Sequence, residues 1–367
     1  MRPGQLTSPA RLSGNVAKLK KAVFFVSLCL CGLVVIRVSA RPQEKPVQKP
    51  EEQKKDQEPF KIGVEVNLVT VPVTVRKPGG GFVKGLSQGA FQVLEDREPQ
   101  EIVSFAQEGV PTRIAIVLDI SGSVLYEWGS IKYATKKFIE NLKKEDKFAI
   151  VTFNEETRLK MDWGSDPSRV DRVLTTVYCK GGTALWDAIY VASTDVFKDI
   201  KEKKAMIIMS DGLDNGSSTS YPEMLDAAVR SEAMIYVVSK TDAVRHSIMF
   251  QMAQQRIYDN IPQELFVQAD TALKKLAYET GGRVLYPNSF GQLDNIYAEV
   301  DEELRNQYTL TYISSNKIKD GGYRHIQVGV AETRVIVSAR PGYYAPNELP
   351  QSHVRSPSEQ IHKSPKR

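Results

Sequence analysis

The spacing of apolar residues changes twice along this chain. From residue 60 to 110, and again from residue 307 to 346, apolar residues alternate with polar ones, as in Val71, Val73 and Val75. Alternation of this kind is typical of strands with one buried face. Between these segments, short continuous apolar runs alternate with stretches of helical spacing. Because continuous apolar runs suit parallel strands buried on both faces, the pattern predicts a doubly wound, mostly parallel α/β domain.

The α/β segment divides into elements of ordinary length. Its predicted strands are residues 113–118, 147–153, 205–209, 234–238 and 283–286. Its predicted helices are residues 131–142, 183–199, 221–231, 269–280 and 290–306. Neither flanking β segment offers enough strands for a stable sandwich by itself. We therefore predict that both β segments pair into one small β-sandwich, into which the α/β domain is inserted.

The two ends of the chain have a composition of their own. Residues 41–59 and 347–367 are rich in charged residues, Gln and Pro and contain no Phe, Trp or Tyr. Such segments cannot bury enough apolar surface to fold. The predicted order is an export signal at 1–40, a disordered linker at 41–59, the first half of the sandwich at 60–110, the α/β domain at 111–306, the second half at 307–346 and a disordered tail at 347–367.

The first 40 residues have the three parts of an export signal peptide. A basic stretch ends at Lys21, an apolar stretch runs from Ala22 to Ile36, and Val38-Ser39-Ala40 supplies small residues for cleavage. The apolar stretch is shorter than the roughly 20 residues of a membrane-spanning helix. We predict an exported protein, either periplasmic, secreted or envelope-associated. The alternative is an uncleaved N-terminal anchor, which would be its one link to a membrane.

The formal charge of +5 does not indicate a nucleic-acid partner. Six of the 49 Lys and Arg residues lie in the first 40 residues, which contain no Asp or Glu. The other 43 basic and 44 acidic side chains give a net charge of −1. The electrostatic case for binding DNA or RNA is therefore absent from the mature chain.

Oxygen-bearing side chains stand at the predicted strand ends. The candidate donors are Asp119, Ser121, Ser123, Thr183 and Asp211. The first three follow one apolar run directly, the last follows another, and the threonine belongs to a Gly-Gly-Thr loop ahead of a predicted helix. Ligands of doubly wound sheets gather at the carboxyl ends of the strands. Because every donor is oxygen, the pattern indicates a site for a hard cation.

The three pieces in this order, D-x-S-x-S, then G-G-T-A-L-W-D-A, then S-D-G, resemble a von Willebrand factor type A (VWA) domain with a metal-ion-dependent adhesion site (MIDAS). The segments V-N-L-V-T-V-P-V-T-V and R-N-Q-Y-T-L-T-Y extend the likeness to the bacterial exported VWFA-related domain family, over most of residues 60–346. The resemblance implies a VWA, Rossmann-like fold flanked by the small β-sandwich.

The resemblance also implies how a metal would be bound. Ser121, Ser123 and Thr183 would bind a divalent cation by hydroxyl, and Asp119 and Asp211 mostly through water. The cation would then take an Asp or Glu carboxylate of a partner protein at its open position. We favour Mg²⁺, with Mn²⁺ or Ca²⁺ as alternatives. The function expected on this basis is that of an exported protein-binding or adhesion module.

Ordinary local structure is the alternative for each of these residues. Asp119 and Ser121 also suit a turn in which side chains bond nearby backbone amides. Thr183 also suits the N-cap of the helix that follows it. Tyr126 and Trp128 come after the first loop and form either an aromatic rim for the partner or packing beneath the loop.

We expect no enzymatic activity. The four histidines, at positions 246, 325, 353 and 362, are scattered, and neither a G-x-S-x-G nor an H-E-x-x-H motif occurs. A metal-dependent phosphoester hydrolase is the less favoured alternative, because no phosphate-binding glycine loop accompanies the site. The other alternative is a structural envelope protein with a vestigial metal site.

Overall fold

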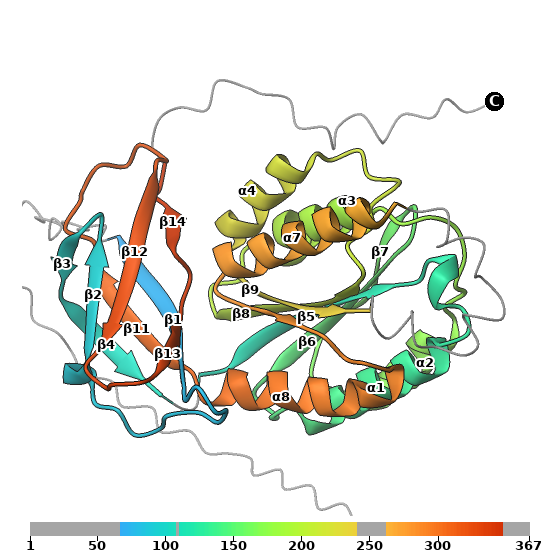
Figure 1. Ribbon diagram of the computed structural model, residues 1–367, viewed down its shortest axis with the longest axis horizontal. Helices are drawn as coiled ribbons and strands as arrows, with labels where there is room; N and C mark the ends of the chain where they lie inside the picture. Colours follow the sequence, from blue (N-terminus) through green and yellow to red (C-terminus); the bar gives the residue numbers. More distant parts are fainter. Residues whose placement is uncertain (1–66, 108–109, 241–261, 348–367) are drawn as a thin grey trace, which may run out of the picture. The chain divides into compact units, whose positions relative to one another are not determined.

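The computed structural model describes residues 67–107, 110–240 and 262–347 (Figure 1). The predicted export signal, the linker and all but the first residue of the predicted tail lie outside these ranges. Within them, no helix is both long and apolar enough to cross a membrane.

A six-stranded sheet forms the centre of the α/β domain, in the order β10-β9-β8-β5-β6-β7. The parallel strands are β5 (Thr112–Asp119), β6 (Lys147–Phe153), β8 (Lys203–Ser210), β9 (Met234–Ser239) and β10 (Val284–Leu285). The edge strand β7 (Thr157–Gly164) pairs antiparallel with β6. The inner strands are buried along almost their whole length, as their continuous apolar runs predicted.

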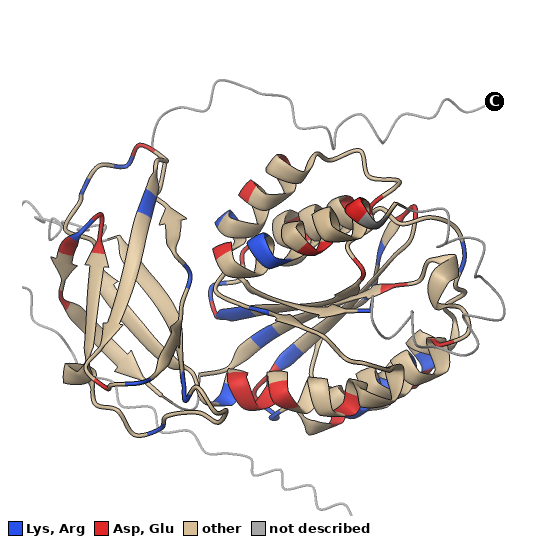
Figure 2. Cartoon of the chain, in the orientation of Figure 1, with Lys and Arg blue, Asp and Glu red and all other residues tan. Residues whose placement is uncertain are grey.

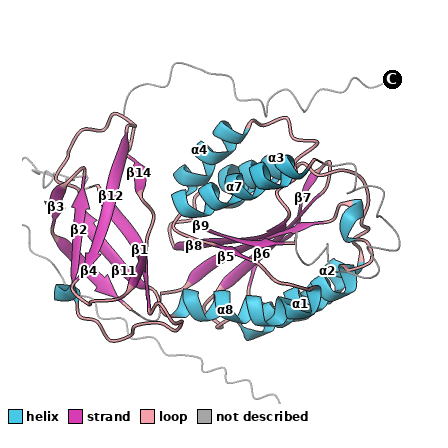
Figure 3. Cartoon of the chain, in the orientation of Figure 1, coloured by secondary structure: helices cyan, strands magenta, loops and turns pink. Residues whose placement is uncertain are grey.

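Helices cover both faces of this sheet (Figure 3). One face carries α1 (Trp128–Asn141), α2 (Val170–Thr175) and α8 (Leu293–Arg305). The other face carries α3 (Leu185–Val191), α4 (Tyr221–Ser231) and α7 (Gln263–Glu279). Successive residues of β5 point to opposite faces, so Ile116 belongs to the first core and Val117 to the second. The predicted doubly wound, mostly parallel fold is confirmed.

Local sequence signals explain where several helices begin. Helix α4 starts after a capping box, in which Ser220 accepts a hydrogen bond from the Glu223 amide and Glu223 accepts one from the Ser220 amide. The short turns outside the main helices are 3-10 turns at Gln88–Ala90, Gly122–Val124, Pro167–Arg169 and Phe290–Gln292, and a π turn at Ala192–Val196. The π turn continues α3 to Val196, toward the predicted end of that helix at residue 199.

Two four-stranded antiparallel sheets form the β-sandwich, in the orders β13-β1-β11-β4 and β14-β12-β2-β3. Strands before the α/β domain are β1 (Leu68–Arg76), β2 (Phe91–Glu95), β3 (Glu98–Gln100) and β4 (Ile102–Ala106). Strands after it are β11 (Tyr308–Ile313), β12 (Tyr323–Val330), β13 (Ile336–Ser338) and β14 (Gly342–Tyr344). Each sheet combines strands from both segments, and the alternating valines of β1 lie in the shared core.

The sequence analysis missed strand β7 and helix α2. In the sequence of β7, charged residues separate Leu159, Met161 and Trp163, and in the structure Met161 and Trp163 pack against the cores on opposite faces of the sheet. A half-exposed edge strand carries a weaker apolar signal than the buried strands beside it. The six-residue helix α2 is too short for helical spacing to be recognised.

A group of buried polar side chains joins the α/β domain to strand β1. We call it the junction cluster, and its members are Thr74, Tyr236, Arg283, Glu303 and Gln307. Glu303 is 1% exposed and accepts a hydrogen bond from Arg283 Nε at 2.6 Å. The Tyr236 hydroxyl and Thr74 Oγ1 each approach the other carboxylate oxygen at 3.4 Å. Figure 2 shows the run of acidic residues along α8 to which Glu303 belongs.

The strand order has a switch point at the carboxyl ends of β5 and β8. Strand β5 lies between β6 and β8, and the chain leaves β5 toward α1 on one face but leaves β8 toward α4 on the other. Loops that diverge in this way open a crevice at the carboxyl ends of the two strands, which is where such sheets bind ligands. Asp119 and Asp211 stand at this point.

Candidate metal centre

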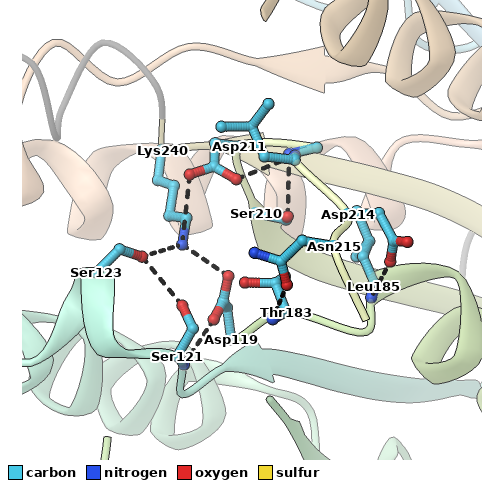
Figure 4. A network of polar contacts seen from close by, with 12 residues as sticks. Asp119, Ser121, Ser123, Thr183, Leu185, Ser210, Asp211, Asp214, Asn215 and Lys240 are labelled. Carbon is cyan, nitrogen blue, oxygen red and sulfur yellow. Dashed lines mark hydrogen bonds and ion pairs between the residues drawn. The ribbon is translucent and has the colours of Figure 1, made fainter. Parts of the chain in front are cut away.

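Strand register brings three charged residues to the same level of the sheet. Leu118 in β5 pairs with Met209 in β8, and Ser210 pairs with Ser239 in β9. Asp119, Asp211 and Lys240 therefore come at the ends of three neighbouring parallel strands. Figure 4 shows their side chains converging. The strand-end rule placed the two carboxylates here, but the sequence analysis did not consider the lysine.

The first loop arranges its own donors. Asp119 is 1% exposed, and its Oδ1 accepts a hydrogen bond from the Ser121 amide at 2.8 Å. Ser121 Oγ lies 3.0 Å from Ser123 Oγ. The turn expected as an alternative for Asp119 and Ser121 is thus present. It also leaves Oδ2 of the carboxylate directed at the neighbouring strands, so the turn and a cation site are compatible.

Lys240 brings a buried ammonium group to these oxygens. Its side chain is 1% exposed, and Nζ lies 2.6 Å from Asp119 Oδ2, 2.9 Å from Ser123 Oγ and 3.6 Å from Asp211 Oδ2. A buried charge of this kind is stable only when it is paired and hydrogen-bonded. The oxygens of the two loops therefore already stabilise a positive charge between them.

The Ser210–Gly212 segment holds Asp211 by backbone contacts. Asp211 Oδ1 accepts a hydrogen bond from the Leu213 amide at 3.1 Å, and Ser210 Oγ accepts one from the Gly212 amide at 3.0 Å. Gly212 has φ +79°, and a Cβ there would come within 2.8 Å of Leu273. Only glycine suits this turn, because another side chain would meet both strain and a clash.

Thr183 is positioned through its backbone. Its amide donates to Asn215 Oδ1 at 2.8 Å, and its carbonyl accepts hydrogen bonds from the amides of Asn215 and Gly216 at 3.0 and 3.1 Å. Thr183 is 8% exposed. The N-cap of α3 is Ala184, so the alternative role of Thr183 as the helix cap is wrong. Positioning by the backbone leaves the side-chain hydroxyl for another role.

Asp214 takes the place of a capping side chain for α3, because the N-cap residue Ala184 has no side chain that could accept a hydrogen bond. Its Oδ1 accepts a hydrogen bond from the Leu185 amide at 2.8 Å, in the first turn of α3. Asp187, further along the same turn, accepts hydrogen bonds from the Ser218 and Thr219 amides. These carboxylates, which the sequence analysis did not assign to the site, tie the loop after Asp211 to the loop of Thr183.

The first loop and the Gly-Gly-Thr loop are joined as well. The Gly122 amide donates to the Gly181 carbonyl at 3.1 Å, and the Lys180 amide donates to the Ile120 carbonyl at 2.9 Å. All three donor segments are therefore linked by hydrogen bonds through backbone or side-chain atoms. The five donors belong to one connected set of loops.

The donor types fit a hard divalent cation. Three hydroxyls and two carboxylates supply oxygen alone, and an ammonium in contact with three of these residues shows that the pocket stabilises positive charge. Across the described ranges, no group of three or more His, Cys, Asp and Glu side chains is suited to a metal. A metal at the strand ends would depend on the serine and threonine hydroxyls.

The surroundings of the loops are partly open. Tyr126 is 50% exposed, whereas Trp128 begins α1 and packs partly against the core. A groove of about 480 Å³ lies beside the first loop and is lined by Ile120, Asn154, Glu155, Glu156, Arg158, Lys160, Thr176, Val177, Tyr178 and Lys180. Burial and, to a smaller extent, the Asp119 carboxylate raise the pKa of the Cys179 thiol to about 11, although Lys240 acts in the opposite direction. This thiol is therefore protonated at neutral pH.

Sequence comparison decides the family. The sequence model of the von Willebrand factor type A domain matches residues 114–299, about half of the chain. This chain belongs to the VWA family. The matched VWA region contains every candidate donor and all of the parallel strands except the first two residues of β5. Domains of this family generally mediate interactions rather than catalysis. No curated protein sequence matches the chain.

Several solved structures are similar to this chain at low sequence identity. A mussel byssus protein, proximal thread matrix protein 1 with a zinc-occupied MIDAS motif, is 17% identical with a TM-score of 0.43, over 57% of this chain and 49% of that one. An aerotolerance-related membrane protein from Bacteroides fragilis is 18% identical with a TM-score of 0.40, over 53% and 98%. A von Willebrand factor type A protein from Catenulispora acidiphila is 12% identical with a TM-score of 0.42, over 78% and 76%. The chain thus spans about half the length of the mussel protein.

Proposed function

We propose that this VWA chain is an exported protein-binding module that holds a divalent cation at a MIDAS-type site and captures an acidic side chain of a partner protein. The cation ligands would be Asp119, Ser121, Ser123, Thr183 and Asp211. Mg²⁺ is the favoured ion, because oxygen donors with several water-mediated contacts suit its octahedral shell. The protein would act outside the cytoplasm, as its leader sequence suggests.

One observation carries this proposal. The ammonium of Lys240 contacts Asp119, Ser123 and Asp211 at once, in a pocket from which water is largely excluded. Side chains from the ends of β5 and β8 thus already act together on one positive charge, which comes from the end of β9. A divalent ion bound there would supply a Lewis-acidic position for an incoming carboxylate.

The residues of this chain would orient that carboxylate. Neutral hydroxyl ligands leave the charge of a bound cation only partly compensated, so an outside anion is attracted more strongly than it would be to a site rich in carboxylates. The half-exposed Tyr126 stands at the edge of the first loop, where a partner would approach. The wall of the neighbouring groove carries Lys160 and Lys180, together with Glu155 and an ion pair between Arg158 and Glu156, so it holds charges of both signs.

Removal of the Thr183 hydroxyl tests the site with little disturbance. In Thr183→Val the backbone contacts to Asn215 and Gly216 are retained, because they involve main-chain atoms of the threonine. Mg²⁺ at about a hundred times its Kd stabilises a protein by about 2.7 kcal/mol, which corresponds to a rise in melting temperature of roughly 5 to 10 °C. We expect this rise in the wild type and its reversal by EDTA.

The variant should lose most of that rise, whereas Thr271→Val, which alters an exposed helical hydroxyl, should keep it. Equal Mg²⁺ shifts in all three proteins would contradict the assignment of Thr183. Capture of partners from an envelope extract should then depend on Mg²⁺ in the wild type and fail with Thr183→Val. Capture that survives both EDTA and the substitution would contradict the role of the metal in binding.

The alternative of a structural protein with a vestigial metal site also has support, from the contacts of Lys240. If Lys240 replaced the cation permanently, the VWA domain would be a scaffold with a vestigial site, held together by the same contacts. Mg²⁺ would then leave the melting temperature of the wild type unchanged. The thermal measurement above therefore separates the two functions directly.

A further inference from the structure

The Lys240 side chain uses the same oxygen atoms that a metal ion would need. Nζ lies 2.6 Å from Asp119 Oδ2 and 2.9 Å from Ser123 Oγ, with Asp211 Oδ2 at 3.6 Å. An ammonium and a divalent ion that share these oxygens would stand only a few ångströms apart in a poorly solvated pocket. Repulsion between like charges is strong at that distance and low solvation. The two cations therefore exclude each other.

We propose that Lys240 is a tethered competitor of the metal, which partly compensates the two carboxylates in the metal-free protein and must withdraw before a divalent ion binds. This inference rests on the proposed function, since it concerns the regulation of the same site. The ligand is the divalent ion, and the regulating group is part of the chain.

Charge balance explains why a competitor is useful here. Asp119 and Asp211 are 1% and 4% exposed, and two carboxylates this deeply buried repel each other when no cation is present. The ammonium group keeps the loops together in the absence of metal. It also lowers the apparent affinity for metal, because some of the binding free energy is used to displace it.

The backbone of Lys240 allows the side chain to leave without unpairing the strand. Its amide donates a hydrogen bond to the Ser210 carbonyl at 3.1 Å, continuing the pairing between β8 and β9. That bond belongs to the main chain, so rotation of the side chain leaves it intact. Displacement thus requires movement of one flexible side chain and not of the sheet.

Substitution of the lysine tests this competition. In Lys240→Met, isothermal titration with Mg²⁺ alone should give a Kd at least about tenfold lower than in the wild type, because no ammonium has to be displaced. The same variant in EDTA should melt at least about 5 °C below the wild type, because the two carboxylates lose their counter-charge. Mg²⁺ should remove most of that deficit.

The matched control is Lys180→Met. Lys180 is exposed and lies next to the Gly-Gly-Thr loop, so its loss changes the net charge near the site equally without touching the buried oxygens. Its Mg²⁺ affinity should stay within about threefold of the wild type. If Lys240→Met behaves like Lys180→Met, the competition is refuted.

Chemical labelling gives an independent readout on the wild type, and it decides the matter if Lys240→Met and the more conservative Lys240→Gln both fail to fold. Lys240 is 1% exposed and should resist acetylation by an N-hydroxysuccinimide ester in EDTA. Saturating Mg²⁺ should raise its labelling at least about fivefold, as measured by peptide mass spectrometry, because the displaced amine reaches solvent. The exposed Lys274 should label equally in both conditions.

The outcomes separate this inference from the proposed function. Equal Mg²⁺ affinity in wild type and Lys240→Met, with unchanged Lys240 labelling, overturns the competition and leaves the metal site standing. Loss of Mg²⁺ binding in Lys240→Met overturns it too, since the lysine would then assist the metal. Absence of Mg²⁺ binding in both proteins overturns the proposed function, and the competition with it.

Discussion

Two groups of charged and polar side chains lie at opposite ends of the same sheet. One is at the carboxyl ends of its strands, and the other is near their amino ends. The first, which we call the strand-end cluster, comprises Asp119, Ser121, Ser123, Asp211 and Lys240. The second is the junction cluster around Glu303. The strand-end cluster holds two carboxylates and one ammonium. The junction cluster holds one carboxylate, paired with one guanidinium.

The difference lies in what supplies the contacts. In the junction cluster, helix, strand and sandwich residues surround Glu303, and the Arg283 side chain also meets the exposed Glu299. In the strand-end cluster, the last residue of β5 and the loops after β5 and β8 supply the oxygens, and one long side chain supplies the cation. A balanced pair on rigid elements suits a permanent joint. An unbalanced set of oxygens on loops suits exchange of its cation.

The largest effect should follow from breaking the junction pair. Arg283→Met leaves the buried Glu303 carboxylate without its ion-pair partner, and loss of one member of a buried pair typically costs about 3 to 5 kcal/mol. Urea denaturation should show this loss equally in EDTA and in Mg²⁺. A loss that Mg²⁺ relieves would mean that the two clusters are coupled, and the comparison would fail.

A second variant sharpens the same test. In Arg283→Met combined with Glu303→Leu, both charges are removed, and much of the stability should return because no unpaired charge is left in the interior. If the double variant is as unstable as the single one, the packing of Arg283 matters more than its charge.

A smaller effect should come from Lys203, at the amino end of β8. Burial lowers its pKa from 10.5 to about 8, although Asp146 and Glu303 act in the opposite direction. The unfolded chain then binds more protons between pH 8 and 10.5, so wild-type stability should rise with pH across that window. Below pH 8 the folded protein bears a cost of about 3 kcal/mol for keeping this lysine charged.

Lys203→Met removes that cost but also the hydrogen bond from Nζ to the Leu304 carbonyl, worth about 1 kcal/mol. The variant should be more stable than the wild type by about 1 to 2 kcal/mol at pH 7 and lose this advantage by pH 10.5. Urea denaturation at the two pH values measures the difference. A constant difference would show that Lys203 has an ordinary pKa.

Ser121→Ala should affect stability still less and metal binding more. Its hydroxyl bonds Ser123 Oγ at 3.0 Å, and loss of one such contact costs about 1 kcal/mol in the absence of metal. Its Mg²⁺-dependent rise in melting temperature should nevertheless largely disappear. Retention of the full rise would exclude Ser121 from the ligand set. The strand-end cluster would then resemble the junction cluster, whose contacts only hold the structure together.

The smallest effect sets the scale for the others. Lys274→Met removes an exposed ion pair with Asp270, in which the lysine side chain is 60% exposed. Pairs of this kind contribute well under 1 kcal/mol, so stability should change by no more than about 0.5 kcal/mol. A larger loss would show that charge burial does not set the order of these effects.

The sequence predicted the parts of the fold that depend on strong apolar runs. Strand β6 and helix α4 begin and end where their patterns indicated, because a continuous run and a capping box mark them clearly. Asp119 and Asp211 became candidate donors for a similar reason, since polar side chains after a buried strand lie at its carboxyl end. Strand β7 was missed because exposed charges dilute its alternation.

Lys240 shows what the strand-end rule lacked. It follows the predicted strand 234–238 closely, so the same reasoning that placed Asp211 at the crevice applied to it as well. Its cationic side chain does not fit a pattern made of oxygen donors. The roles of Asp214 and Asn215 depend on contacts across loops about thirty residues apart, and such contacts leave no pattern in the local sequence.

The pairing of β4 with β11 shows where the VWA domain is inserted into the sandwich. Ala106, the last residue of β4, lies opposite Thr309 at the start of β11. The chain therefore leaves the sandwich at the end of β4 and re-enters it at the start of the neighbouring antiparallel strand, β11. In an ordinary hairpin, a tight turn joins two such strands. In topological terms, the entire VWA domain occupies the position of a single reverse turn, so its excision would leave the sandwich strands in their order.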